Sequence, residues 1–99
     1  MSEATFWFSS PYKEWIGQRT LILSWEGKLT VRGFWERLVT DYPKLRKNLP
    51  REGLHEEAMG QVVAVIMDGD ILALDSVIRD GAKVDVVTPL SGGSDVERL

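Results

Sequence analysis

Residues 62–93 read VVAVIMDGDILALDSVIRDGAKVDVVTPLSGG, and this stretch decides the fold. Its first six residues are apolar on both faces, which is typical of a central strand. The pair Asp68-Gly69 favours a tight hairpin turn, and residues 71–74 then predict a short return strand. Residues 84–87 alternate between apolar and polar side chains and predict the last strand of the sheet.

Upstream of this stretch, the sequence predicts two strands and one main helix. Phe6-Trp7-Phe8 and residues 20–25 have strand character, and the residues between them indicate a wide hairpin. Thr30 is a candidate N-cap, and Pro43 predicts the end of the helix, because proline cannot continue the hydrogen-bond ladder. The apolar side chains between these two residues recur at helical spacing and form one broad stripe: Val31, Phe34, Trp35, Leu38, Val39 and Tyr42.

Residues 44–60 are polar and mixed, with Pro50, Gly53 and Gly60 as breakers, so we expect a long surface connection with one helical turn at residues 54–59. The order is then strand, strand, helix, strand, short strand, strand. A mixed sheet of this order packed on one main helix is the β-grasp arrangement of ubiquitin, an α+β fold. A ferredoxin-like fold needs a second helix, which only residues 44–60 are able to supply.

The composition excludes several classes of function. The 99 residues are 43% hydrophobic and 27% charged, which predicts one globular domain. With no cysteine and one histidine, the chain has no thiolate site and no multi-histidine zinc site, so we expect no metal and no cofactor. The net charge of −3 argues against a nucleic-acid partner, and no apolar run is long enough to span a membrane. The first residues show no signal-peptide pattern, so a cytoplasmic location is expected.

The sequence also offers no catalytic constellation. His55 stands beside Glu56 and Glu57 in a polar segment, where a histidine is usually solvated. Asp68 and Asp70 flank a glycine, but they lack the ligand series of a calcium loop, so a hairpin turn is expected there. There is no nucleophile elbow and no Walker-type glycine loop. We therefore expect a protein that is not itself an enzyme.

The motifs of residues 62–93 resemble, in their order, those of the ubiquitin-like sulfur carriers. This family includes the small subunit of molybdopterin synthase and a relative from the thiamine pathway. The shared motifs are turns and an aspartate set between apolar strands, followed by a proline and a terminal glycine pair: Asp68-Gly69, Asp75, Asp80-Gly81, Pro89 and Gly92-Gly93. The helix opening at residues 29–32 is also similar. The long segment between the main helix and the third strand favours the molybdopterin type.

The chain departs from the family pattern at three places. Ala82 stands where an acidic residue is usual, and Thr88-Pro89 replaces a proline pair. Gly93 is followed by residues 94–99, whereas family members end in a glycine carboxylate. That tail occupies the carbon that would have to be a free carboxylate.

The resemblance implies a carrier that acts with partner enzymes. In the family, an adenylating enzyme related to ubiquitin-activating enzymes activates the terminal glycine with ATP. Sulfur then replaces AMP and leaves a thiocarboxylate. Gly93, with Gly92, would be the acyl-carrying residue here, once a protease has removed residues 94–99. A large synthase subunit is a further expected partner, in the biosynthesis of a cofactor such as molybdopterin.

The expected organisation is a β-grasp domain over residues 1–90 and a flexible arm with a short tail over residues 91–99. Pro89 and Leu90 lie just before this arm, and Pro89 helps to direct the chain away from the sheet, because proline fixes one φ angle and removes a hydrogen-bond donor. We expect both residues to contact a partner.

Trp7 points away from Phe6 and Phe8 if that segment is a regular strand. With Ile22 from the neighbouring strand, Trp7 forms an exposed patch for a partner, or the two are covered by residues 44–60. The sequence leaves both interpretations open. It also leaves an alternative function open, that of a ubiquitin-like protein modifier or a non-catalytic interaction domain.

Overall fold

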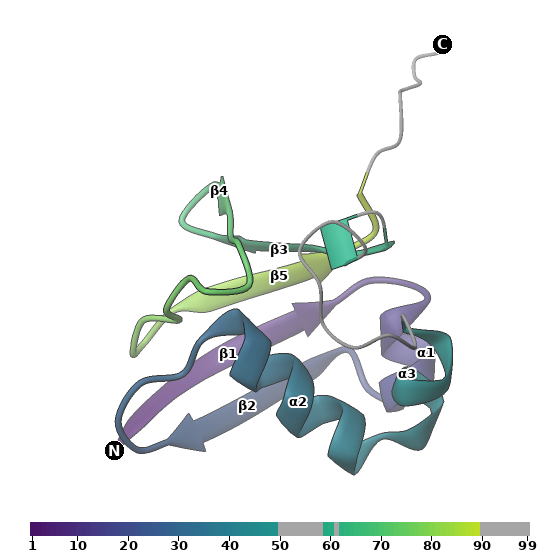
Figure 1. Ribbon diagram of the computed structural model, residues 1–99, viewed down its shortest axis with the longest axis horizontal. Helices are drawn as coiled ribbons and strands as arrows, with labels where there is room; N and C mark the ends of the chain where they lie inside the picture. The colour runs from purple at the N-terminus through teal and green to yellow at the C-terminus, as the bar shows by residue number, and fades with distance from the viewer. Residues whose placement is uncertain (50–58, 61, 90–99) are drawn as a thin grey trace, which may run out of the picture.

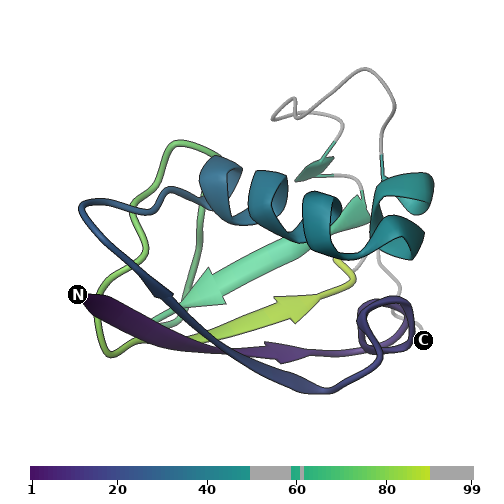
Figure 2. The ribbon, with the colours of Figure 1, turned by 90° about the horizontal axis from the view of Figure 1, so that it is seen from below.

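The computed structural model of the protein describes residues 1–49, 59–60 and 62–89. It contains a five-stranded mixed sheet in the order β2-β1-β5-β3-β4, and the helix α2 (Val31–Asp41) lies across one face of it (Figures 1 and 2). The strands follow the chain in the expected order: β1 (Ser2–Phe8), β2 (Thr20–Trp25), β3 (Ala64–Met67), β4 (Asp70–Ile71) and β5 (Lys83–Val87). Two short helices, α1 (Tyr12–Ile16) and α3 (Pro43–Asn48), lie together at one end of the sheet (Figure 1).

The two central strands, β1 and β5, run parallel, and the remaining pairings are antiparallel. On one side of this central pair β2 joins β1, and on the other side β3 joins β5. In the described residues, α3 has six residues and packs near α1, so it does not add a second helix on the face of the sheet. The topology is therefore the predicted β-grasp fold.

Local signals position α2 as the sequence predicts. The Thr30 side chain accepts a hydrogen bond from the Gly33 amide at 3.1 Å, which satisfies one of the unpaired donors of the first turn. The helix ends at Asp41, and Tyr42 is its C-cap. Pro43 does end this helix, but it also begins α3, because the first helical position needs no amide donor.

The core fills the space between α2 and the inner face of the sheet. The Phe6 and Phe34 rings stack with their centroids 4.5 Å apart, and Trp35 meets the Phe34 ring at 4.9 Å in an edge-on arrangement. The side chains that are completely buried come from α2, α3 and the two central strands: Phe6, Phe34, Trp35, Leu38, Leu45, Val84 and Val86. Trp25 and Leu23 share the inner face of β2, as the two-residue period predicts.

The β3–β4 turn is the predicted tight hairpin. Asp68 has φ 55° and Gly69 has φ 84°, and two successive positive φ angles are typical of a type I′ turn. The Asp68 carboxylate accepts hydrogen bonds from one Arg79 nitrogen at 2.9 and 3.0 Å. It therefore connects the turn to the segment that precedes β5. No group of three acidic or histidine side chains that could hold a metal ion occurs in the part of the chain that the structure describes.

Two short helices, α1 and α3, form in segments where the sequence predicts only connections. In the β1–β2 connection, α1 forms because Tyr12 and Ile16 lie one turn apart and are both buried, and Gly17 ends it with φ 92°. Likewise, α3 forms where Leu45 is buried against the core. The expected helical turn at residues 54–59 falls mostly outside the described residues. Within the described ranges, no helix is long and apolar enough to cross a membrane.

We expect Leu38→Ala to lower the free energy of unfolding by about 2–5 kcal/mol, because the completely buried side chain would leave a cavity in the core. Ile22→Ala is the matched control, since Ile22 is 61% exposed, and it should cost less than about 1 kcal/mol. Urea unfolding followed by tryptophan fluorescence measures both. Equal losses in the two variants would contradict this assignment of the core.

Candidate functional site

The glycine pair that the sequence predicts as the working end, Gly92-Gly93, lies outside the described residues, and Leu90 does as well. The structure describes the chain up to Pro89. The candidate site is therefore built from the residues at which the arm leaves the sheet, which we call the arm root (Thr88 and Pro89), and from the face of the sheet beside them.

Hydrogen bonds hold the end of β5 and the arm root against the segment that follows β1. The amide of Ser9 donates to the Val86 carbonyl at 3.0 Å, and the Ser9 hydroxyl donates to the same oxygen at 3.3 Å. The hydroxyl of Thr88 donates to the Ser10 carbonyl at 3.1 Å. These contacts exist because β1 and β5 are parallel, so the carboxyl ends of both strands reach the same edge of the sheet.

Tyr12 joins the arm root to a third segment. Its side chain is buried, and its hydroxyl donates a hydrogen bond to the Val62 carbonyl. Burial raises the pKa of the Tyr12 hydroxyl, and a hydrogen bond with the Thr88 side chain acts in the opposite direction. A tyrosine hydroxyl is protonated at neutral pH, and the raised pKa extends this protonation to higher pH, so the hydroxyl remains a donor to Val62.

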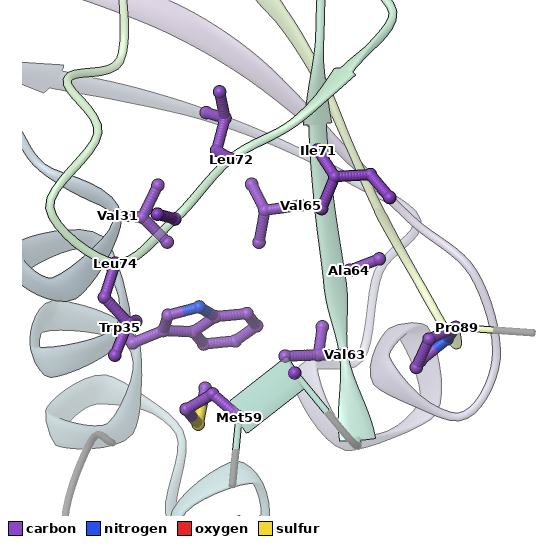
Figure 3. Close-up of a pocket in the computed structure, with 12 residues that line it drawn as sticks. Val31, Trp35, Met59, Val63, Ala64, Val65, Ile71, Leu72, Leu74 and Pro89 are labelled. Carbon is purple, nitrogen blue, oxygen red and sulfur yellow. The ribbon is translucent and has the colours of Figure 1, made fainter. Parts of the chain in front are cut away.

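Pro89 is half-buried and lies on the other side of the arm root, at the edge of an apolar hollow of about 340 Å³ (Figure 3). Trp35 and Pro89 lie on opposite sides of this hollow, with Val63 between them and Met59 below Trp35 (Figure 3). The proline ring thus borders an apolar hollow, and proline fixes its own φ angle at the residue where the description of the chain ends.

The face of the sheet that α2 does not cover carries two of the predicted partner residues, Trp7 and Ile22. Thr5 pairs with Ile22, and Trp7 pairs with Asp85, so these four side chains share one face, since residues two apart in a strand point the same way. Trp7 is 43% exposed and Ile22 is 61% exposed. Figure 2 shows no helix over this face among the described residues. We call it the outer face.

A second hollow, of about 350 Å³, lies beside Trp7 on the outer face. Its lining combines an aromatic ring with charged and hydroxyl side chains: Trp7, Phe8, Ser9, Ser10, Lys13, Arg19, Asp85 and Val87. Ser9 and Ser10 also hold the arm root, so the hollow and the root share one border. An apolar centre with a charged rim has the anatomy of a protein-binding surface.

The structure thus brings Trp7 close to the arm root, whereas Ile22 lies on the next strand, further from it. Sequence reasoning missed Ser10, Tyr12 and Thr88. Their partners are distant in the sequence, with 78 positions between Thr88 and Ser10 and 50 between Tyr12 and Val62. The one local signal for Tyr12 was its spacing of four residues from Ile16, which is too short a pattern to distinguish a helix from a loop.

We expect Tyr12 to make the stability of the protein fall at alkaline pH. Because the folded state holds the hydroxyl proton more tightly, the unfolded chain loses it first as the pH rises through the ordinary tyrosine value of 10.0, and unfolding is then favoured. Tyr12→Phe removes this contribution, so the stability advantage of the wild type should be constant below about pH 9 and shrink above about pH 10. Urea unfolding at a series of pH values measures this difference. An advantage that stays constant across pH 10 would contradict the raised pKa.

Comparison with solved structures supports the fold. The chain is similar to small archaeal modifier protein 1 of Haloferax volcanii, with 20% identity and a TM-score of 0.73 over 91% of this chain and 100% of that chain. It is similar to a Pyrococcus furiosus protein described as molybdopterin converting factor, subunit 1, with 19% identity and a TM-score of 0.73 over 91% and 100% of the two chains. A chain of the BexX/CysO complex of Amycolatopsis orientalis matches with 16% identity and a TM-score of 0.62 over 91% and 99%. These identities establish the fold alone.

A sequence comparison with curated proteins finds no match. The family model of the ThiS family, in contrast, matches residues 8–93, which is most of the chain. The match includes β5, the arm root and both glycines of the predicted working end. The chain therefore belongs to the ThiS family, the family of ubiquitin-like sulfur carriers that its motifs resemble.

Proposed function

We propose that the protein is a sulfur carrier for cofactor biosynthesis, of the molybdopterin type, and that Gly93 carries the sulfur after residues 94–99 have been removed. The observation that carries the proposal is the family match, which runs through β5 and the arm root and ends on Gly93. The six residues beyond that point, Ser94 to Leu99, would then be a tail for a protease to release.

The proposed chemistry takes place on the Gly93 carboxylate in two steps. A carboxylate oxygen attacks the α-phosphate of ATP, pyrophosphate leaves, and an acyl-adenylate remains. Hydrosulfide, or sulfur in an equivalent oxidation state from a partner, then attacks the acyl carbon, and AMP leaves. The product is a thiocarboxylate, which a large synthase subunit would use as its sulfur donor.

The chain contributes the acyl group and its presentation, and the adenylating enzyme contributes the catalytic groups. Glycine residues suit this task, because a backbone without side chains passes through a narrow channel and approaches a nucleotide closely. Hydrogen bonds made by Ser9, Tyr12 and Thr88 hold the base of the arm, which suits its presentation to a partner. We propose that the protein itself is not an enzyme and needs no cofactor.

We propose that the adenylating enzyme docks through Trp7 and Ile22 on the outer face and through Pro89 and Leu90 beside it. Trp7 and Ile22 are exposed apolar side chains on one face, and Pro89 lies at the arm root. Large apolar and aromatic side chains bordered by charges supply most of the binding energy in typical interfaces. A partner on this face would also be close to the arm that it has to receive.

A second candidate function is that of a ubiquitin-like protein modifier, in which the activated Gly93 is joined to lysine side chains of other proteins. The structural similarity to small archaeal modifier protein 1 favours it, since the name of that protein describes a modifier. The two functions share adenylation and differ in the nucleophile that attacks the acyl carbon.

The deciding experiment incubates a form of the protein that ends in Gly93 with ATP, sulfide and the adenylating enzyme of the same organism. Mass spectrometry should detect the replacement of one oxygen atom by sulfur. The full-length chain that ends in Leu99 should stay unmodified, because its glycine carbon is held in an amide bond. Gly93→Ala in the trimmed form should sharply reduce adenylation and leave the fold intact, since a methyl group would stand beside the reacting carbon.

The outcomes separate the two candidates. A thiocarboxylate supports the carrier, and isopeptide bonds to lysines in the absence of any thiocarboxylate support the modifier. Normal adenylation of the trimmed Gly93→Ala variant would contradict the role given to Gly93.

For the docking surface, we expect Trp7→Ala and Ile22→Ala each to raise the KM of the adenylating enzyme for the carrier about tenfold and to leave kcat nearly unchanged. Val77→Ala is a matched control, because Val77 is 45% exposed but pairs with Thr30 at the start of α2, away from the outer face. Initial rates of pyrophosphate release measure both constants. Unchanged KM values for both outer-face variants would exclude this face as the docking surface.

A further inference from the structure

We infer that Thr88 and Tyr12 are positioning residues, which fix the direction in which the arm leaves the sheet and so determine how well the Gly93 carboxylate reaches ATP. The inference rests on the proposed function, because it concerns the efficiency of the adenylation step. Neither Thr88 nor Tyr12 would touch the reacting atoms.

The first observation is the hydrogen-bond arrangement around Thr88. Its hydroxyl donates to the Ser10 carbonyl at 3.1 Å, and its side chain also forms a hydrogen bond with the Tyr12 hydroxyl. A threonine hydroxyl has a single proton, and here it has two acceptors within reach, both in the segment after β1. Whichever acceptor the Thr88 hydroxyl uses, its hydrogen bond therefore joins the arm root to the segment that follows β1.

The second observation is that the partner of Thr88 is itself fixed. Tyr12 is 2% exposed, and its hydroxyl donates to the Val62 carbonyl, in the segment that leads into β3. Its ring contacts Trp15 edge-on with the centroids 5.6 Å apart. A buried ring with a bonded hydroxyl has little freedom to move, so it is a rigid support for the first residue of the arm root.

The third observation is the placement of the support at the base of the arm. Five peptide units separate Thr88 from Gly93, and an extended segment of that length spans about 17 Å. Once the enzyme holds the arm extended, a rotation of about 10° at its base would displace the far end by about 3 Å, whereas a misplacement of about 1 Å at a reacting centre is already costly. Small freedom at Thr88 therefore becomes large freedom at the carboxylate.

We therefore expect a change at Thr88 to affect the catalytic step and not docking. The outer face, which binds the enzyme, is unchanged when the Thr88 hydroxyl is removed. A looser arm root lowers the fraction of bound complexes in which the carboxylate lies against ATP, so kcat falls while KM stays nearly constant. A residue that merely stabilises the fold would not produce this separation of kcat from KM.

The test measures ATP–pyrophosphate exchange by the adenylating enzyme of the same organism, with carriers that end in Gly93. We expect Thr88→Val to lower kcat about threefold to tenfold, the effect of one hydrogen bond, with KM within about twofold of the wild type. Thr88→Ser restores the hydroxyl and should restore kcat. Thr40→Val is the matched control, because the Thr40 hydroxyl also donates to a backbone carbonyl, that of Glu36 at 2.9 Å, but lies on α2.

A second variant tests the other member of the pair. Tyr12→Phe should also lower kcat, and the double variant should lose no more than about the larger single loss, because the two residues act as one support. Thermal unfolding of each variant identifies any loss of the folded state, and rates are compared only below that temperature.

The outcomes distinguish the inference from the function on which it rests. If the wild type drives no exchange, the proposed function is overturned and the inference with it. If the wild type is active and Thr88→Val has the same kcat, only the inference is overturned. A rise in KM alone would identify Thr88 as a contact of the enzyme and would also overturn its positioning role. A lower kcat that Thr88→Ser restores supports the inference.

Discussion

Trp7 and Asp85 stand side by side in the parallel strands β1 and β5, although they come from opposite ends of the chain. This parallel pairing is the constraint on which the rest of the structure depends. It brings the carboxyl ends of both strands to one edge of the sheet, where Ser9 meets Val86 and Ser10 meets Thr88. The inner sides of the same two strands carry Phe6 and Val84, against which α2 packs. The fold and the arm root therefore arise from a single pairing.

The two faces of the sheet have separate tasks. The inner face is covered by α2, and its stacked rings of Phe6 and Phe34 supply apolar burial for the whole fold. The outer face keeps Trp7 and Ile22 exposed, next to charged side chains such as Asp85. Because alternate residues of one strand serve the two faces, a substitution on the outer face is expected to have little effect on the core. This separation would let the proposed carrier bind partner enzymes without losing stability.

The short helix α1 connects these two tasks. Its first residue, Tyr12, is buried against the core and bonds to Val62, while its hydroxyl also contacts Thr88 at the arm root. A five-residue helix is not stable alone, so it exists because the core holds Tyr12 and Ile16. The arm root is consequently supported by the core through one side chain, and the proposed chemistry of Gly93 begins from a defined direction.

The sequence by itself determined the elements with strong local signals: the helix from Thr30, the Asp68-Gly69 turn, the order of the strands and the family motifs that end in Gly92-Gly93. These signals are local because caps, positive φ angles and apolar periodicity act between near neighbours. Only the tertiary structure decided that α1 and α3 form, that Trp7 is exposed, and that Thr88 bonds to Ser10. Short helices and contacts between distant segments depend on packing energy that no local pattern encodes, so they appear only once the sheet has assembled.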